Sequence, residues 1–156
     1  MSNALQRFKE SARAMGLSFE VKRFPQGTRT AAEAARAVGC DVGQIVKSLV
    51  FVADDEPFLA LTSGRNQADP SRMAARLGAS EVRRANADEV RAATGFAIGG
   101  TPPFGHLRPL TVLVDRDLLG WDEVWAAAGT PDAVFALSPD DLVRASGGRV
   151  EDFAAR

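Results

Sequence analysis

The sequence predicts an α/β protein of the α+β type, in which a mixed β-sheet is surrounded by helices. Strand-length apolar runs and amphipathic helical segments are interspersed along the 156 residues. The strands are not regularly separated by helices, however, as a doubly wound parallel sheet would require. We therefore expect hairpins and a sheet with both parallel and antiparallel pairs. The length fits a single domain spanning residues 1–156.

Segments rich in β-branched and aromatic residues, bounded by turn residues, predict the strands. We expect them at residues 17–24, 45–52, 58–63, 81–84, 110–115 and 133–137. The sequence Asp54-Asp55-Glu56-Pro57 separates the second strand from the third, so these two are predicted to form a hairpin. Residues 121–126 are ambiguous between strand and helix.

Helices are predicted where apolar residues recur at helical spacing between a capping residue and a glycine. These segments are residues 3–15, 30–39, 69–77, 86–95 and 138–147, with a short helical turn at 41–44. Thr30 and Glu33 have the spacing of a capping box. Asp69 and Pro70 form an N-cap followed by a proline at the first helical position.

Composition excludes several classes of function. The net charge of −1 argues against a protein that grips long stretches of nucleic acid, DNA included. Cys40 is the only cysteine and His106 the only histidine, so no disulfide and no Cys/His metal site is expected. The first residues lack the pattern of a secretory signal, and no apolar run reaches membrane-spanning length. These facts favour a cytoplasmic protein that does not bind membranes.

Lys47 lies within the most apolar run of the chain, at residues 45–52. In a strand both faces of this run are mostly apolar, which predicts that the strand is covered on both sides. A buried ammonium is expensive to desolvate unless it is paired or its pKa falls. The chain has three lysines against sixteen arginines, so a lysine at this position is a candidate functional group. The alternative is a lysine near a strand end that reaches water along its own stem.

Six arginines fall within a 27-residue stretch that contains few acids, and they could form a local basic patch that contacts phosphate groups. They are Arg65, Arg72, Arg76, Arg83, Arg84 and Arg91. The more common explanation for arginines at this density is a solvated surface.

The segment at residues 98–106 has the composition of a stiff recognition loop. Gly99 and Gly100 let a backbone approach a ligand without obstruction by Cβ, and Pro102 and Pro103 stiffen the chain. Such a loop suits recognition of an ester carbonyl or a ribose hydroxyl, although it could also be a rigid connection. His106 follows the loop and could act as an acid or base, but a surface histidine is more common. No serine-hydrolase triad is apparent.

Several segments together resemble the YbaK/EbsC family of aminoacyl-tRNA deacylases, which are related to the editing domain of bacterial prolyl-tRNA synthetases. The resemblance runs from about residue 20 to 150. It rests on the strand that contains Lys47, the Gly-x-x-x-Pro loop from Gly99 to Pro103, and three shorter matches, at residues 30–35, 63–66 and 122–129.

The resemblance implies a barrel-like form of the mixed sheet. It also implies hydrolysis of the ester that joins a wrong amino acid to a tRNA, with tRNA(Pro) as the expected substrate. We expect Lys47, Gly99 and Gly100 to be catalytic. The expected substrate-binding residues are Asn66, Thr101, Pro102, Pro103 and His106. His106 is included for its position alone, because family members differ there, and we expect the chemical step not to depend on it.

In the expected mechanism water attacks the ester, helped by the vicinal ribose hydroxyl, and no metal or organic cofactor takes part. The expected partners are the acceptor end of tRNA and, as a second possibility, prolyl-tRNA synthetase. A different class of function stays open: a non-catalytic module that binds aminoacyl-tRNA or a synthetase. A small-molecule esterase is a third alternative, which the lack of a nucleophile set disfavours. The amino acid removed is not predicted, because folding brings the pocket's side chains together.

Overall fold

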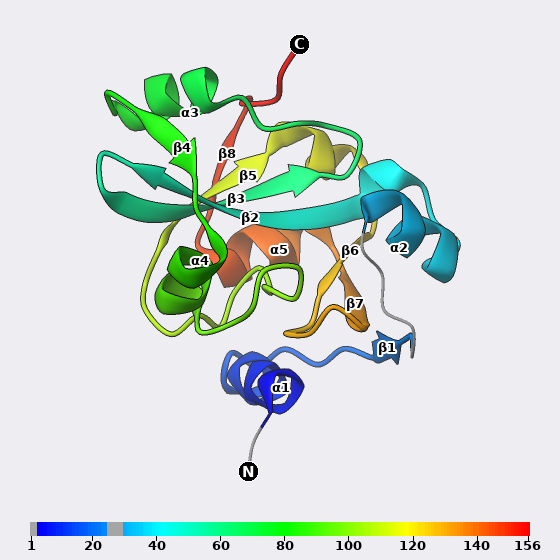
Figure 1. The fold of residues 1–156 in the computed structure, drawn as a ribbon. Helices are drawn as coiled ribbons and strands as arrows, with labels where there is room; N and C mark the ends of the chain where they lie inside the picture. The colour runs from blue at the N-terminus through cyan, green and yellow to red at the C-terminus, as the bar shows by residue number, and fades with distance from the viewer. Residues whose placement is uncertain (1–2, 25–29) are drawn as a thin grey trace.

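The computed structural model describes residues 3–24 and 30–156, which form a mixed sheet of eight strands packed among helices (Figure 1). The sheet order is β1-β7-β6-β2-β3-β5-β8, and β4 pairs with β2 outside this path. The strands are β1 (Val21–Arg23), β2 (Ile45–Ala53), β3 (Glu56–Ser63), β4 (Val82–Arg84), β5 (Thr111–Asp115), β6 (Val124–Ala127), β7 (Ala133–Leu137) and β8 (Arg149–Glu151). Strands β1 and β8 end the path without pairing with each other, so the sheet is an open form of the expected architecture.

The mixed pairing predicted from the sequence is confirmed. Antiparallel pairs join β2 to β3 and to β4, and β7 to β1 and to β6. Parallel pairs join β2 to β6, β3 to β5, and β5 to β8. The β2–β3 hairpin also forms as expected, and its turn places both Asp54 and Asp55 at positive φ, 46° and 72°. Two successive positive φ values match the twist of a hairpin, and Asp tolerates them better than most residues.

Helices cover the sheet and its ends. They are α1 (Ala4–Ala14), α2 (Ala31–Val38), α3 (Pro70–Leu77), α4 (Ala87–Thr94) and α5 (Pro139–Ser146), with 3-10 turns η1 (Val42–Gln44) and η2 (Arg116–Gly120). In Figure 1, α1 lies below the sheet, α3 above it and α2 at one side. The predicted caps form: the side chain of Thr30 accepts a hydrogen bond from Glu33 N, and that of Asp69 accepts one from Ser71 N.

The main core lies on the β2 face that carries Val46, Val50 and Val52, as the two-residue alternation predicts. Its aromatic part joins the N-terminal segment to the sheet. Phe8 of α1 packs against Phe135 of β7 with ring centroids 4.9 Å apart. A second, smaller cluster around Phe51 lies on the other face of β2.

Three segments differ from the sequence-based expectation. The strand expected at residues 17–24 is paired only over β1, because Leu17 and Phe19 pack into the core without a neighbouring strand. The ambiguous segment at residues 121–126 ends in a strand, β6. Strand β8 was not expected, since its three residues lack an apolar run and depend on pairing with β5.

One edge of β2 is interrupted. Strand β6 pairs with β2 at Ile45 and Val46, and β4 pairs with it from Phe51 to Ala53. Between these two contacts, residues 47–49 have no neighbouring strand on this edge within the described part of the chain. We call this interval the β2 gap. It leaves room beside the strand that carries Lys47.

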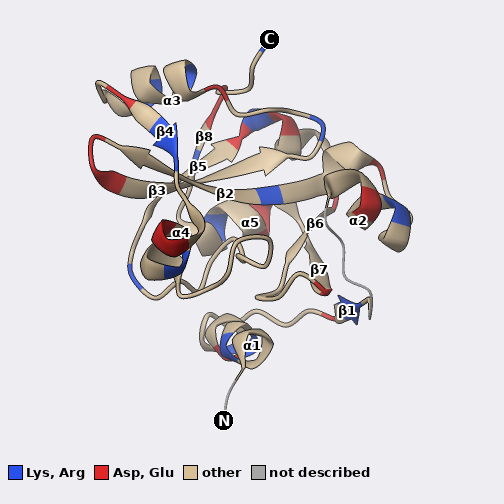
Figure 2. Ribbon diagram, in the orientation of Figure 1, with Lys and Arg blue, Asp and Glu red and all other residues tan. Residues whose placement is uncertain are grey.

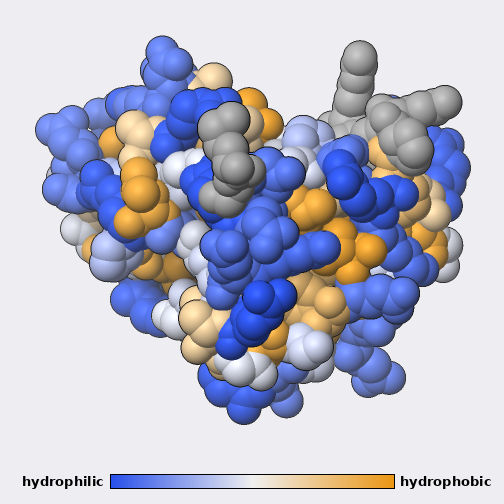
Figure 3. All heavy atoms as spheres, turned by 90° about the horizontal axis from the view of Figure 1, so that it is seen from below, coloured by the Kyte–Doolittle hydropathy of each residue, from blue (hydrophilic) through white to orange (hydrophobic). Residues whose placement is uncertain are grey.

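Charges of both signs are spread over the helices and loops (Figure 2). The face seen from below is mainly hydrophilic, with apolar atoms in smaller patches between (Figure 3). Among residues 3–24 and 30–156, no helix is long and apolar enough to cross a membrane.

Candidate functional site

A cavity of about 590 Å³ lies at the β2 gap. Its walls come from the N-terminus of α2, the strands β2, β4, β6 and β7, and the loop that follows α4. Both faces of β2 contribute, because Lys47 and Val46 border it from opposite sides of the strand. The cavity thus brings together the two segments that carry the resemblance, the Lys47 strand and the Gly99 loop.

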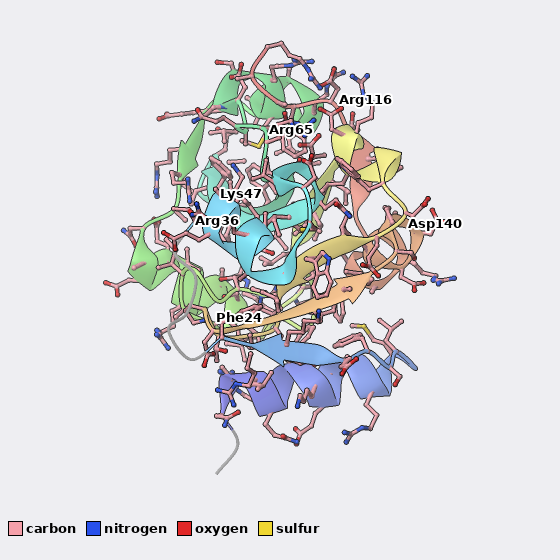
Figure 4. The ribbon with its side chains drawn as sticks, turned by 90° about the vertical axis from the view of Figure 1, so that its right-hand side faces the viewer. Phe24, Arg36, Lys47, Arg65, Arg116 and Asp140 are labelled. Carbon is pink, nitrogen blue, oxygen red and sulfur yellow. The ribbon has the colours of Figure 1, made fainter. Side chains whose placement is uncertain are left out.

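Lys47 is the third residue of β2 and is half-buried. Its ammonium donates a 2.6 Å hydrogen bond to the backbone carbonyl of Asn66. Figure 4 shows Lys47 beside α2, and residues 31, 32 and 34 of this helix border the same cavity. The hydrogen bond to Asn66 O fixes the ammonium of Lys47 at one position. Lys47 is a cation held in a cavity wall.

Asn66 contacts Lys47 through its backbone carbonyl, and its side chain points to other partners. Its side-chain amide donates to Asp115 at 2.9 Å and to Asp117 at 2.8 Å. Asp115 is fully buried and also accepts hydrogen bonds from the backbone N–H groups of Ser63 and Asp117. Asn66 does not border this cavity. The network instead fixes the carbonyl that receives the Lys47 ammonium.

The surroundings of Lys47 shift its pKa in opposite directions. Burial, and then the nearby positive charge of Arg84, lower the pKa of Lys47, whereas the carboxylate of Asp115 raises it. Among the described residues that border the cavity, Lys47 and Arg84 carry charges and none is acidic. The cavity therefore favours an anionic or electron-rich ligand.

The loop segment at residues 98–106 contributes three residues to this cavity, Ile98, Gly99 and Thr101. Gly99 has a φ of +89°, a conformation that suits glycine. Thr101 is buried, and its hydroxyl donates to Ala97 O at 3.1 Å. The Thr101 side chain thus ties the loop to the backbone of Ala97.

Gly100 does not border the cavity, and its lack of a side chain serves packing between loops. A Cβ built on Gly100 would lie 2.8 Å from Thr130 Cα and 2.9 Å from Thr130 C. This contact with backbone leaves no room for a side chain, so Gly100 lets the loop approach the chain before β7. Its expected catalytic role stays a prediction.

Pro102 and Pro103 end the loop, and His106 follows it in the sequence. Both prolines are buried, and neither they nor His106 border this cavity. His106 Nε2 lies 2.7 Å from Pro102 O and donates to it when protonated at that nitrogen. Burial lowers the pKa of His106, so the neutral ring is favoured at neutral pH. His106 braces the loop here, and contact of these three residues with substrate stays a prediction.

Most arginines of the Arg65–Arg91 stretch pair with carboxylates of the protein itself. Arg65, Arg72, Arg76 and Arg83 form ion pairs with Asp41, Asp152, Glu151 and Glu89, respectively. Arg84 differs from these four because it borders the cavity, and its guanidinium carbon lies 5.6 Å from the centroid of the Phe51 ring. Within the stretch, Arg84 is therefore the candidate for contact with a ligand.

Other chemistries find little support in the described residues. No group of three or more His, Cys, Asp or Glu side chains there could hold a metal ion. Burial, followed by the carboxylates of Asp41 and Glu123, raises the pKa of the Cys40 thiol. A raised pKa disfavours the thiolate that a cysteine nucleophile requires.

The sequence profile of the aminoacyl-tRNA editing domain matches residues 25–145, most of the chain. The chain belongs to the aminoacyl-tRNA editing domain family. The cavity therefore lies in an editing domain, at the segments expected to form the site.

Relatives of this editing domain occur both inside synthetases and as short proteins. This chain is 31% identical over 104 residues to a proline–tRNA ligase of Limosilactobacillus fermentum. The match covers 64% of this chain but only 18% of the ligase. This chain is also 29% identical over 124 residues to the uncharacterized protein YwhH of Bacillus subtilis, of which it covers 78%. A crystal structure described as a proposed trans-editing enzyme for prolyl-tRNA synthetase superposes with a TM-score of 0.94. The protein in that crystal structure is 45% identical in sequence to this chain. The superposition covers 100% of this chain and 99% of the other.

Sequence reasoning missed several contributors to the cavity, among them the N-terminus of α2 and Ser48. The capping signal at Thr30 predicted where α2 begins, but its approach to Lys47 depends on the fold. Ser48 gave no signal, because a serine is unremarkable in a strand. It borders the cavity next to Lys47.

Proposed function

We propose that this editing domain hydrolyses the ester of mischarged aminoacyl-tRNA in trans, with tRNA(Pro) as its substrate. One observation carries the proposal: Lys47 and Gly99 border the same cavity in a chain of the editing family. The similarity to proline–tRNA ligases and to a proposed trans-editing enzyme supports the choice of tRNA. Because aminoacyl-tRNA is made and used in translation, we expect the protein to act in the cytoplasm, with prolyl-tRNA synthetase as a possible partner.

In the proposed mechanism a water molecule attacks the ester carbonyl. The vicinal ribose hydroxyl of the substrate assists this water, so no protein nucleophile is needed. The loop around Gly99 positions the terminal nucleotide and its ester. Lys47 stabilises the negative charge that develops on the substrate, and one preorganised group of this kind contributes roughly 3 kcal/mol.

The charged part of the cavity lining suits the phosphate of a terminal nucleotide. Arg84 supplies positive charge there in addition to Lys47 at the ester, and the N-cap Thr30 and the first residues of α2, Ala31 and Ala32, also border the cavity. Backbone N–H groups in the first turn of a helix favour anions. A ligand with an anionic end and an uncharged ester end matches this distribution.

A panel of tRNAs charged with different amino acids tests the proposal. We expect release of at least one non-cognate amino acid from tRNA(Pro) at a rate far above spontaneous hydrolysis, and no release of proline. Binding of charged tRNA without release would indicate the non-catalytic module. Cleavage of simple amino-acid esters at the same rate would indicate a small-molecule esterase, since these esters lack the ribose hydroxyl.

A further inference from the structure

Helix α1 packs against the loop that borders the cavity, although it precedes residues 25–145, which match the editing-domain profile. The loop leaves the end of α4, and Leu107 N donates a 2.9 Å hydrogen bond to Thr94 O across its base. A surface loop whose two ends meet in this way can move as a unit apart from the sheet. Figure 1 shows α1 below this loop. Contacts from α1 can therefore decide which position the loop takes.

Arg7 of α1 holds the start of the loop. Its guanidinium donates a 2.9 Å hydrogen bond to Gly95 O, and its guanidinium carbon lies 4.8 Å from the centroid of the Phe96 ring. Gly95 ends α4 with a left-handed φ of 81°, so its carbonyl lies beyond the hydrogen bonds of the helix. Arg7 is exposed whereas Phe96 is buried. A change at Arg7 therefore removes these contacts without opening the core.

The other end of the loop is held by aromatic packing and by a close approach of the backbone. Phe104 is buried, and its ring centroid lies 5.1 Å from that of Phe8 in α1. Gly105 has a φ of +80°, and a Cβ built on it would lie 2.9 Å from Ser11 Cβ in α1. Helix α1 thus contacts both ends of a loop whose middle borders the cavity at Gly99.

Helix α1 also supports the turn against which the loop packs. A Cβ built on Gly129 would lie 2.7 Å from Ala4 O in α1. The next residue of this turn, Thr130, is the one that Gly100 approaches closely, and Pro131 of the same turn borders the cavity. A helix that contacts both the loop and its support fixes the two relative to each other.

We propose that α1 holds the loop in the form that binds substrate, with Arg7 as its positioning residue. Arg7 does not border the cavity and acts through Gly95 and Phe96. This inference rests on the proposed function, because it takes the loop around Gly99 to position the terminal nucleotide and its ester. When only a fraction of the molecules has the competent loop, the apparent dissociation constant rises in inverse proportion to that fraction. Loss of Arg7 therefore weakens substrate binding and spares the chemical step.

Kinetics of Arg7→Met on mischarged tRNA(Pro) test the proposal. Methionine keeps an unbranched stem and removes the guanidinium with its bond to Gly95 O. We expect KM to rise by roughly tenfold, the effect of losing one hydrogen bond, while kcat stays near the wild-type value. Arg7→Lys keeps a positive charge that can donate to Gly95 O, so it should recover part of the loss. An unchanged KM in Arg7→Met, with or without a fall in kcat, would overturn the proposal.

The matched control is Arg13→Met, which removes an exposed arginine from the last turn of the same helix. This variant should keep the wild-type KM. A rise in KM equal to that of Arg7→Met would overturn the proposal, because a general loosening of α1 would then explain both variants.

Amide hydrogen exchange separates this inference from the proposed hydrolysis, because it needs no substrate. Gly100 N donates a 3.1 Å hydrogen bond to Ala97 O within the loop, so the exchange of this amide reports local opening. Arg7→Met should accelerate it by roughly tenfold and leave the amides of β3 unchanged. That result supports positioning by Arg7 even if no ester is hydrolysed. An unchanged rate at Gly100, or an equal acceleration in β3, would overturn it even if hydrolysis occurs.

Discussion

The ammonium of Lys47 donates a 2.6 Å hydrogen bond to the backbone carbonyl of Asn66. A carbonyl orients the cation without neutralising it, as a carboxylate partner would. The carboxylate of Asp115, which raises the pKa of Lys47, accepts a hydrogen bond from the Asn66 side chain instead. Lys47 is thus fixed in direction by a group that carries no charge.

Replacing Lys47 with alanine should lower kcat/KM for deacylation by roughly 100-fold, the scale of losing one charge-stabilising group. The fold should remain, because removing a costly half-buried charge does little harm to stability. Lys47→Arg should not restore full activity, since a planar guanidinium cannot reproduce the compact ammonium at Asn66 O. Circular dichroism and rates on mischarged tRNA check both variants. Near wild-type turnover in folded Lys47→Ala would exclude the proposed role.

The pKa of Lys47 should lie below that of free lysine, about 10.4. NMR of the lysine side chains can follow it directly, because the chain has only three lysines and Lys47→Arg identifies the signal. Arg84→Gln should raise the Lys47 pKa, since it removes a positive charge that lowers it. A midpoint that does not move in Arg84→Gln would show that the two cations do not interact.

The same shift predicts how stability depends on pH. Between the lowered pKa and about 10.4 the unfolded chain binds more protons at Lys47 than the folded chain does. The contribution of this residue to the free energy of unfolding therefore rises with pH across that window. Denaturation of wild-type protein and Lys47→Met at several alkaline pH values isolates it, and a contribution that falls with pH would contradict the direction of the shift.

Arg84→Gln should weaken tRNA binding and reduce the slope of log affinity against log salt by about 0.7, the value for one phosphate of a single strand. Arg83→Gln is the matched control, because Arg83 already bonds to Glu89 through two nitrogens, at 2.9 and 2.7 Å. It should leave affinity nearly unchanged. Fluorescence anisotropy at several salt concentrations gives both slopes. Identical slopes in the two variants would show that Arg84 is a solvated surface residue that does not contact a phosphate.

Gly100→Ala should destabilise the protein by about 1–3 kcal/mol, because the new Cβ would meet the Thr130 backbone at 2.8 Å. Gly120→Ala provides the control, since a Cβ there has no heavy atom within 4 Å. Urea denaturation should separate the two variants clearly. Similar midpoints for both would mean that the loop moves away from Thr130 without cost.

His106→Ala should reduce activity by less than about tenfold, through loosening of the loop at Pro102. The pH–rate profile should show no inflection near 6.5 that disappears in the variant, because the ring bonds to the loop and does not border the cavity. A loss of several hundredfold, with such an inflection in the wild type, would identify His106 as a general base.

Local signals in the sequence determined most of the elements and part of the site. The alternation in β2 predicted which side chains share a face, because successive residues of any strand point to opposite sides. Caps at Thr30 and Asp69 and the turn at Asp54 could be read directly, since each depends on a few neighbouring residues. Lys47 stood out because a charge in an apolar run conflicts with the desolvation cost of burying it.

Tertiary structure decided what surrounds that charge. The β2 gap exists because β4 and β6, distant in sequence, pair with β2 at its two ends and leave the middle open. Only this pairing lets Ser48 border a cavity, and only folding separates Arg84, which also borders it, from its neighbour Arg83, which is ion-paired with Glu89. Such roles depend on contacts between remote segments, and periodicity within one segment carries no information about them.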